Sequence, residues 1–343
     1  MVRRMPVMPA PIAVMVVLAS AVVVVVAGPR MVRVADRLAD TTGLGEAFIG
    51  AVLVGAATSL PDLLATVLPA ARGLPDLAVG NALGGVLGQT AFLAVADLTY
   101  RRANLEHAAA SLPNIVQATL LITLLGGMLA LFVSPPVSVL GVHPGSVLLL
   151  VGYGYGLRLV TATSETPMWR AVSTTETRGD VAQEPRRRRG GSRSLLVRFA
   201  GLAVVLGGAG VALALAGESL VTVAGVEQTV VGVLVTGVVS SLAELVVSIS
   251  AIRAGALTLA VGNVIGGNTF DTLLVVAADV AYRPGPVYAA VGPQQAFVAA
   301  VSVVATAVLV LGLLRRERHG MANIGFESVL VLLLYVAVVL VLT

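Results

Sequence analysis

The sequence contains no cysteine and no lysine, and it has few aromatic or charged residues. Without cysteine there is no disulfide, no thiolate metal site and no cysteine nucleophile. Aromatic residues make up 4% of the chain, which argues against the stacking platforms that bind nucleic acid. Charged residues make up 12%. A soluble domain carries about 25%, so this chain has too little polar surface to coat a globule.

Apolar residues take the place of the missing polar ones, at 57% of the chain with a mean hydropathy of +0.96. Stretches long enough to cross a hydrocarbon core of about 30 Å recur ten times. The predicted spans are residues 11–28, 45–71, 75–98, 112–133, 138–160, 195–216, 226–253, 256–280, 287–314 and 326–342. The first span lacks a convincing small-residue cleavage site and is followed by nine more spans, so we interpret it as a retained helix and not a signal peptide. The sequence predicts an all-α integral membrane protein with ten transmembrane helices.

The two halves of the chain align without a gap when the sequence is shifted by 182 residues. The shift places Asp62 on Glu244, and the run 77–81 on the identical run 259–263. Each half holds five predicted spans, and because five is odd the second half enters the membrane from the opposite side. We therefore predict two inverted five-helix repeats, residues 1–160 and 195–343, joined by a loop at 161–194. Inverted repeats are typical of secondary transporters, whose sites lie near the bilayer midplane.

The distribution of arginine predicts the orientation. With the N-terminus outside, 18 of the 22 arginines fall on the inner side. Both termini are then outside, and the loop 161–194 is cytoplasmic. We interpret this loop as a linker, with lipid binding by its arginine run 186–189 as a secondary alternative. The Val/Ala-rich, lysine-free composition indicates a prokaryotic cell (inner) membrane.

Three carboxylates, those of Asp62, Glu244 and Asp271, fall inside predicted spans. A carboxylate at mid-membrane costs at least about 2.5–3.5 kcal/mol and normally faces a cavity where it binds something. The structural alternative is that they pair with arginine or with backbone donors, but no arginine lies deep in any span. Pro61 deletes one backbone N–H and frees carbonyls one turn upstream. Such carbonyls, together with hydroxyls and carboxylates, are hard oxygen ligands suited to Ca²⁺ or Na⁺.

The second half has Ala243 where the first has Pro61. Any unwinding of the helix before Glu244 must therefore come from serine hydroxyls, Gly237 or a bound ion. The next span of each half carries G-N-x-x-G-G, followed by Gln89 in one half and Asp271 in the other. The asparagines of this motif, Asn81 and Asn263, either coordinate an ion or hydrogen-bond a neighbouring helix. We interpret two further carboxylates near span ends, at positions 97 and 279, as caps or as groups solvated at the membrane interface.

These motifs resemble those of the calcium/cation antiporter superfamily, to which sodium/calcium exchangers belong. That superfamily carries G-T-S-x-P-E on one helix and G-N-x-x-G-S-N-x-F-N/D on the next, in each of two inverted repeats. The first repeat here reads A-T-S-L-P-D at 57–62 and G-N-A-L-G-G-V-L-G-Q at 80–89. The second reads V-S-S-L-A-E at 239–244 and G-N-V-I-G-G-N-T-F-D at 262–271.

The resemblance implies a role for each matching position. It implies acidic calcium ligands at Asp62 and Glu244, carbonyl donors at Thr58 and Ser240, sodium-binding hydroxyls at Ser59 and Ser241, and a completing polar pair at Gln89 and Asp271. It also implies that spans 1 and 6 are long tilted helices that slide across the ion-binding core. Two departures remove hydroxyls expected to help hold sodium, because Gly85 and Gly267 replace the family's serines.

The expected function is a secondary antiporter, not an enzyme, that exchanges Ca²⁺ or a related divalent cation for Na⁺ by alternating access. The alternative driving ion is H⁺, since clustered buried carboxylates can carry protons. Inorganic cations and the lipid bilayer are the expected partners of a monomer, with no cofactor and no nucleic acid. A passive cation channel is a further alternative. An intramembrane aspartyl protease is disfavoured because the chain lacks a G-x-G-D run.

Overall fold

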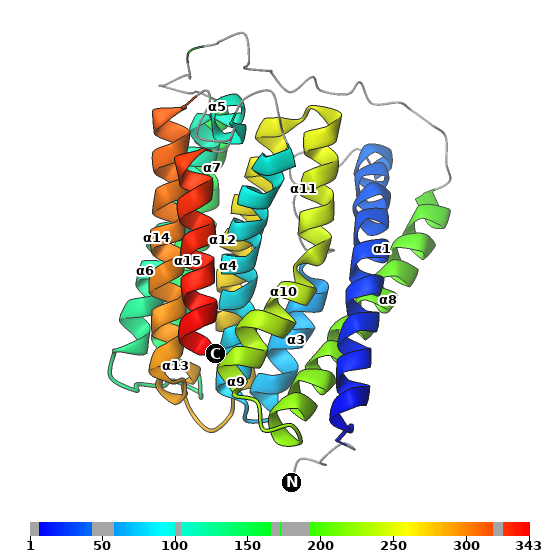
Figure 1. The fold of residues 1–343 in the computed structure, drawn as a ribbon, viewed down its shortest axis with the longest axis vertical. Coiled ribbons are helices and arrows are strands. Elements are labelled where there is room, and N and C mark those ends of the chain that lie inside the picture. Colours follow the sequence, from blue (N-terminus) through cyan, green and yellow to red (C-terminus); the bar gives the residue numbers. More distant parts are fainter. Residues whose placement is uncertain (1–6, 43–57, 100–103, 166–171, 173–191, 318–324) are drawn as a thin grey trace.

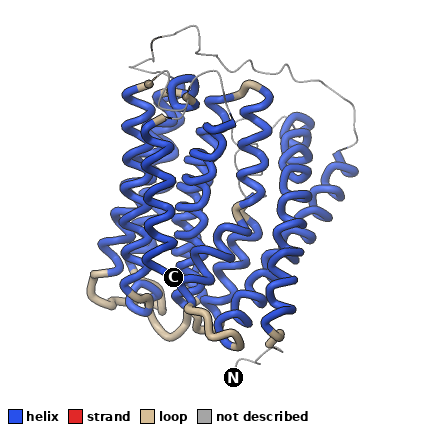
Figure 2. Tube along the Cα trace, in the orientation of Figure 1, coloured by secondary structure: helices blue, strands red, loops and turns tan. Residues whose placement is uncertain are grey.

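The computed structural model describes residues 7–42, 58–99, 104–165, 172, 192–317 and 325–343. The described residues form helices and connections (Figure 2), apart from one isolated bridge between Val139 and Val142. The prediction of an all-α fold is therefore confirmed for this part of the chain.

Seven of the described helices are long and apolar enough to cross a membrane. They are α1 (Ala10–Thr42), α4 (Pro75–Thr99), α6 (Leu112–Phe132), α7 (Pro144–Glu165), α8 (Ser192–Thr222), α12 (Leu257–Ala281) and α14 (Pro293–Arg315). An eighth span results if the segment Gln228–Ser240 is joined to α11 (Leu242–Ala254) across a bend of 43°. The segment before the bend consists of α9 (Gln228–Val230), the π-helix η1 (Val231–Thr236) and α10 (Gly237–Ser240).

Two shorter apolar helices, α3 (Leu60–Ala71) and α15 (Phe326–Leu342), fall within the second and tenth predicted spans. Two short helices, α5 (Leu105–Ala109) and α13 (Val287–Ala290), lie in connections. The first part of the second predicted span lies outside the described residues, so the count of ten helices stays a prediction.

The helices α1 and α8 are longer than their predicted spans, at 33 and 31 residues. Helices of this length measure about 45–50 Å, which exceeds a hydrocarbon core of about 30 Å and requires tilting or protrusion. They lie side by side along one edge of the molecule (Figure 1). The ends of α7 and α8 also extend into the predicted loop 161–194, to Glu165 and from Ser192.

The centre of the molecule is built on α4 and α12, with α3, α10 and α11 packed between them and the α1–α8 pair. Glycines allow α4 to approach η1 and α10 backbone to backbone. A Cβ built on Gly84 would lie 2.4 Å from the carbonyl oxygen of Val233, and one built on Gly237 would lie 2.6 Å from that of Asn81. Small residues permit such close helix contacts, where packing drives association in a membrane.

Asp97, at the end of α4, ties that helix to two others. Its Oδ1 accepts a hydrogen bond from the backbone N–H of Leu105 at 2.7 Å. Its Oδ2 accepts bonds from the Ser328 hydroxyl at 3.0 Å and the Gly325 N–H at 3.3 Å. Asp97 therefore holds the starts of α5 and α15 against the end of α4.

Asp279, at the end of α12, is the repeat equivalent of Asp97, 182 positions later in the chain, and it makes the equivalent contacts. Its Oδ1 accepts a bond from the Val287 N–H at 2.8 Å. Its Oδ2 accepts bonds from the Ser146 hydroxyl at 2.7 Å and the His143 N–H at 2.8 Å. Of the two interpretations, the structure shows capping, because both aspartates are buried and accept bonds from backbone N–H groups. Each also holds a helix from the other half of the chain.

Candidate cation site

The site begins at two breaks with the same backbone conformation. Helix α3 starts after Ser59, whose φ and ψ are −83° and 3°, and α11 starts after Ser241, at −84° and 3°. Pro61 follows the first break, but Ala243 follows the second, so proline is not required for the conformation. The π-helix η1 precedes the second break. No pattern in the sequence signals this π-helix, although single π turns are frequent at functional sites.

Asp62 and Glu244 lie in the first turns of α3 and α11. The N–H groups of a first turn have no partner within the helix, and the helix dipole favours negative charge there. Each carboxylate accepts a hydrogen bond from its own backbone N–H. The two side chains are only 1% and 2% exposed. The breaks thus place two carboxylates in the interior, where backbone donors support them.

Each break also supplies a hydroxyl to the carboxylate of the other. The Ser240 hydroxyl donates to Oδ1 of Asp62 at 2.5 Å. The Thr58 side chain, at the equivalent position in the first half, hydrogen-bonds Glu244. These contacts join residues about 180 positions apart and hold the two breaks together.

The third carboxylate, that of Asp271, enters from α12. Its Oδ2 accepts a hydrogen bond from Nε2 of Gln89, on α4, at 2.7 Å. The same amide donates to the Ser241 hydroxyl at 3.3 Å, and that hydroxyl lies 3.4 Å from Oδ1 of Asp62. Ser59 is buried at the break before α3. The structure therefore brings seven of the eight sequence-predicted residues into two sets of hydrogen bonds, and Ser59 lies directly after Thr58 at the break.

Each of the three carboxyl groups keeps one buried oxygen without a hydrogen-bond partner. These atoms are Oδ2 of Asp62, Oε2 of Glu244 and Oδ1 of Asp271, and Oε1 of Gln89 is in the same condition. A buried polar atom normally has a partner, so four such atoms in one region need an explanation. Within the described residues, no three His, Cys, Asp or Glu side chains already stand in a metal-ligating arrangement. A cation would therefore have to draw these oxygens inward from their present positions.

Two glycines leave space beside these side chains. A Cβ on Gly85 would lie 3.1 Å from the Ser241 hydroxyl, 3.5 Å from Oδ2 of Asp271 and 3.7 Å from Oδ1 of Asp62. A Cβ on Gly267 would lie 2.9 Å from Oε1 of Gln89. A larger residue at position 85 would therefore point into the middle of the polar network.

The two motif asparagines behave differently. Nδ2 of Asn81 donates to the Thr66 hydroxyl at 3.0 Å and to the Asp62 carbonyl at 3.3 Å, which ties α4 to α3. At the equivalent positions in the second half, Nδ2 of Asn263 and Oγ of Ser248 are buried without a hydrogen-bond partner. For Asn81 the structure shows hydrogen bonding to a neighbouring helix, one of the two readings that the sequence left open.

Two further glycines, which the sequence analysis did not identify, bring α1 and α8 against the carboxylate helices. A Cβ on Gly28 would lie 2.5 Å from Cβ of Ala243, and one on Gly210 would lie 2.7 Å from the carbonyl oxygen of Pro61. In each case the contacted residue directly precedes an acidic residue of the candidate site, Glu244 or Asp62. The 182-residue offset relates the two glycines and was the signal that could have found them.

Comparison with known proteins identifies one family and several relatives. The family profile described as "Sodium/calcium exchanger protein" matches residues 12–162 and 194–343. CaxA of Alkalimonas amylolytica, whose name describes an antiporter, is 28% identical over 358 residues, which cover 93% of this chain and 98% of CaxA. The structure of a H⁺/Ca²⁺ exchanger, CAX, has a TM-score of 0.65 at 16% identity, covering 96% of this chain and 82% of CAX. That of the sodium-calcium exchanger NCX_Mj has a TM-score of 0.60 at 16% identity, covering 96% and 98%.

Proposed function

The chain belongs to the sodium/calcium exchanger protein family, and from this premise we propose that it exchanges Ca²⁺, or a related divalent cation, for Na⁺ by alternating access. The family resemblance stated from the motifs is thereby confirmed, and the protein is a multi-span membrane antiporter of the calcium/cation exchanger family. The observation that carries the proposal is the set of three buried carboxylates on three helices, each with one unpaired oxygen.

We propose that these oxygens are the cation ligands. Calcium takes six to eight oxygens in flexible geometry. The carboxylates of Asp62, Glu244 and Asp271, with Gln89 and the backbone carbonyls of Thr58 and Ser240, offer that kind of donor set. The hydroxyls of Ser59 and Ser241 are the proposed sodium ligands. The Ser241 hydroxyl lies 3.4 Å from Oδ1 of Asp62, so we propose that the two sets of ligands are too close together for both ions to be bound at once.

Mutual exclusion would couple the two fluxes. Uncompensated carboxylates in a low-dielectric interior are strongly unfavourable. The protein would therefore change its access from one side to the other only when Ca²⁺ or the counter-ions occupy the site.

The proposed architecture is ten helices in two inverted repeats, 1–160 and 195–343, with the loop 161–194 in the cytoplasm and both termini outside the cell membrane. The matching breaks, the crossed contacts of Asp97 and Asp279, and the paired glycines 28 and 210 support it. The start of α1 and the end of α15 also lie toward the end of the molecule opposite to the start of α8 (Figure 1). The unequal pairing of Asn81 and Asn263 supports alternating access, since inverted repeats must differ in conformation for the site to open to one side only.

One observation favours H⁺ as a second candidate for the driving ion. The Ser240 hydroxyl lies 2.5 Å from Oδ1 of Asp62 and 2.7 Å from the carbonyl oxygen of Thr236. A hydroxyl has one proton, so it can donate to only one of these oxygens. A proton on Oδ1 of Asp62 would be donated to Ser240, which would then donate to Thr236, so that each of these three oxygens would take part in a hydrogen bond.

Uptake of Ca²⁺ into proteoliposomes tests the proposal. Vesicles containing the purified protein are loaded with Na⁺, with acid, or with neither, and diluted into Ca²⁺ buffer. We expect uptake driven by the outward Na⁺ gradient. Uptake driven only by acid would make H⁺ the counter-ion. Uptake with neither gradient would identify a channel and overturn the antiporter, and absence of uptake under all three conditions would overturn Ca²⁺ as substrate.

Gly85→Ser tests whether hydroxyls limit sodium binding. The new hydroxyl would stand among Ser241, Asp271 and Asp62 and add one oxygen ligand for Na⁺. We expect the Na⁺ concentration for half-maximal exchange to fall roughly two- to tenfold, the effect of one polar interaction. Gly85→Ala is the matched control, because it adds the same Cβ without the hydroxyl. Equal sodium dependence in the two variants would contradict a role for an oxygen at this position.

A further inference from the structure

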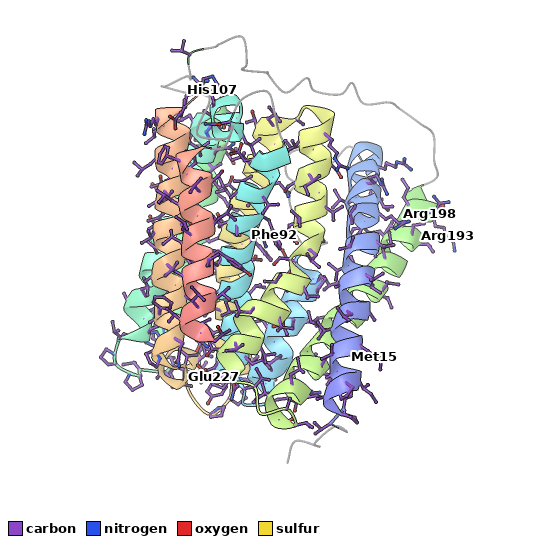
Figure 3. All side chains as sticks on the ribbon, viewed as in Figure 1. Met15, Phe92, His107, Arg193, Arg198 and Glu227 are labelled. Atoms are coloured by element: carbon purple, nitrogen blue, oxygen red, sulfur yellow. The ribbon has the colours of Figure 1, made fainter. Side chains whose placement is uncertain are left out.

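An open groove of about 580 Å³ lies between the last turns of α1 and the first turns of α8, away from the cation site. Its lining combines four arginines with small and apolar residues: Arg30, Arg33, Val34, Arg37, Arg198, Gly201, Leu202 and Val205. Figure 3 shows Arg193 and Arg198 at this end of α8. The groove thus lies on the two long helices that contact the carboxylate helices through glycine.

The arginines of the groove form a concentrated positive charge. Arg30, Arg33 and Arg37 are spaced three and four residues apart, so they share one face of α1. All four arginine side chains are exposed. The ion pairs among the described residues join Arg72 to Glu218 and Arg315 to Glu317, and neither involves the groove. The segments that form it keep an excess of positive charge even when Asp36 and Asp40 are counted.

The apolar part of the groove continues along the two helices. Val34, Leu202 and Val205 lie beside the arginines. On α1, the exposed valines at positions 26 and 22 lie about one and two turns before Arg30, within the candidate span Ala10–Ala35. A ligand that fits both parts must carry negative charge at one end and long apolar chains at the other.

We propose that this groove binds an anionic phospholipid, with its phosphate held by the arginines and its acyl chains lying along the valines of α1 and α8. Guanidinium groups bind phosphate oxygens in bidentate pairs, and the fixed charge of arginine suits this contact. The arginines stand at the end of the apolar span Ala10–Ala35, where lipid head groups lie. The head-group charge matches the arginines, and a soluble phosphate would leave the apolar part of the groove unused.

A lipid in this position would bridge the two long helices at one end. Gly28 of α1 and Gly210 of α8 contact the residues directly before Glu244 and Asp62. If the proposed antiport is correct, movement of these helices controls access to the site, and the lipid would restrain their relative movement. Binding itself does not depend on the transported ions.

Native mass spectrometry of the full chain in detergent, with added phosphatidylglycerol or phosphatidylcholine, tests the proposal without any ion gradient. The test variant is Arg33→Gln with Arg198→Gln. The matched control is Arg158→Gln with Arg253→Gln, which removes two exposed arginines outside the groove. We expect the wild-type chain and the control to bind phosphatidylglycerol in preference to phosphatidylcholine, and the test variant to bind it about tenfold more weakly.

Three results would overturn the proposal. Equal binding of phosphatidylglycerol by the test and control variants would show that the groove is not the site. Equal binding of the two lipids by the wild-type chain would remove the role of charge. Displacement of the lipid by inorganic phosphate at matched concentration would identify a free-anion site. Each result concerns lipid binding alone, so the antiport proposal would stand or fall separately in the vesicle assay.

Discussion

Glu244→Gln and Asp62→Asn are each expected to abolish Ca²⁺ exchange while the protein still folds. Each amide keeps the size of the acid and one oxygen but removes the negative charge that attracts the cation. Loss of one partner from a buried charge interaction costs several kcal/mol, so we expect the rate of exchange to fall about 100-fold or more. The measurement is gradient-driven Ca²⁺ uptake in proteoliposomes, with size-exclusion chromatography of the same preparations as the test of folding.

Glu227→Gln is the matched control for these two variants. It makes the same chemical change as Glu244→Gln, but on an exposed side chain that hydrogen-bonds Gln294 outside the cation site. Exchange by the control should equal that of the wild-type chain. Wild-type rates in Glu244→Gln or Asp62→Asn would show that these carboxylates are not the ligands.

Gly84→Ala is expected to destabilise the protein by about 1–3 kcal/mol, the range for overpacking a close contact. The added Cβ would lie 2.4 Å from the carbonyl oxygen of Val233 and 2.5 Å from its Cα. These are backbone atoms of η1, which cannot rotate away as a side chain can. The midpoint of thermal unfolding in detergent should fall below that of the wild-type chain.

Gly126→Ala provides the comparison, because a Cβ at this position of α6 meets nothing within 4 Å. Alanine is favoured over glycine inside a helix by about 0.5–1 kcal/mol, so this variant should be as stable as the wild-type chain or slightly more so. If Gly84→Ala unfolded at the same temperature as Gly126→Ala, the close approach of α4 to η1 would not matter for stability.

Many residues of the candidate site can be predicted from local patterns in the sequence. The length of each apolar run predicts a membrane-spanning segment. Such a segment must be helical, because it has to satisfy its own backbone hydrogen bonds within the bilayer. A carboxylate within such a segment is unusual by itself, and the 182-residue offset pairs Asp62 with Glu244 without any knowledge of the fold. Position near a span end limits Asp97 and Asp279 to capping or interface solvation, and the buried hydrogen bonds of the structure show capping. These features depend on residues close in sequence, or on a repeat that the sequence displays directly.

The membrane class, the internal repeat and the candidate site residues can therefore be predicted from the sequence. How the two halves meet depends on the tertiary structure: the break at Ser241 without a proline, the π-helix beside it, and the contacts of Gly28 and Gly210 with the carboxylate helices. The tertiary structure also shows two features that the sequence does not: the unequal hydrogen bonding of Asn81 and Asn263, and the arginine groove between α1 and α8. Hydropathy and spacing report the environment along one helix. The tertiary features instead depend on distances between helices that are far apart in the chain, and those distances are set by how closely the helices pack.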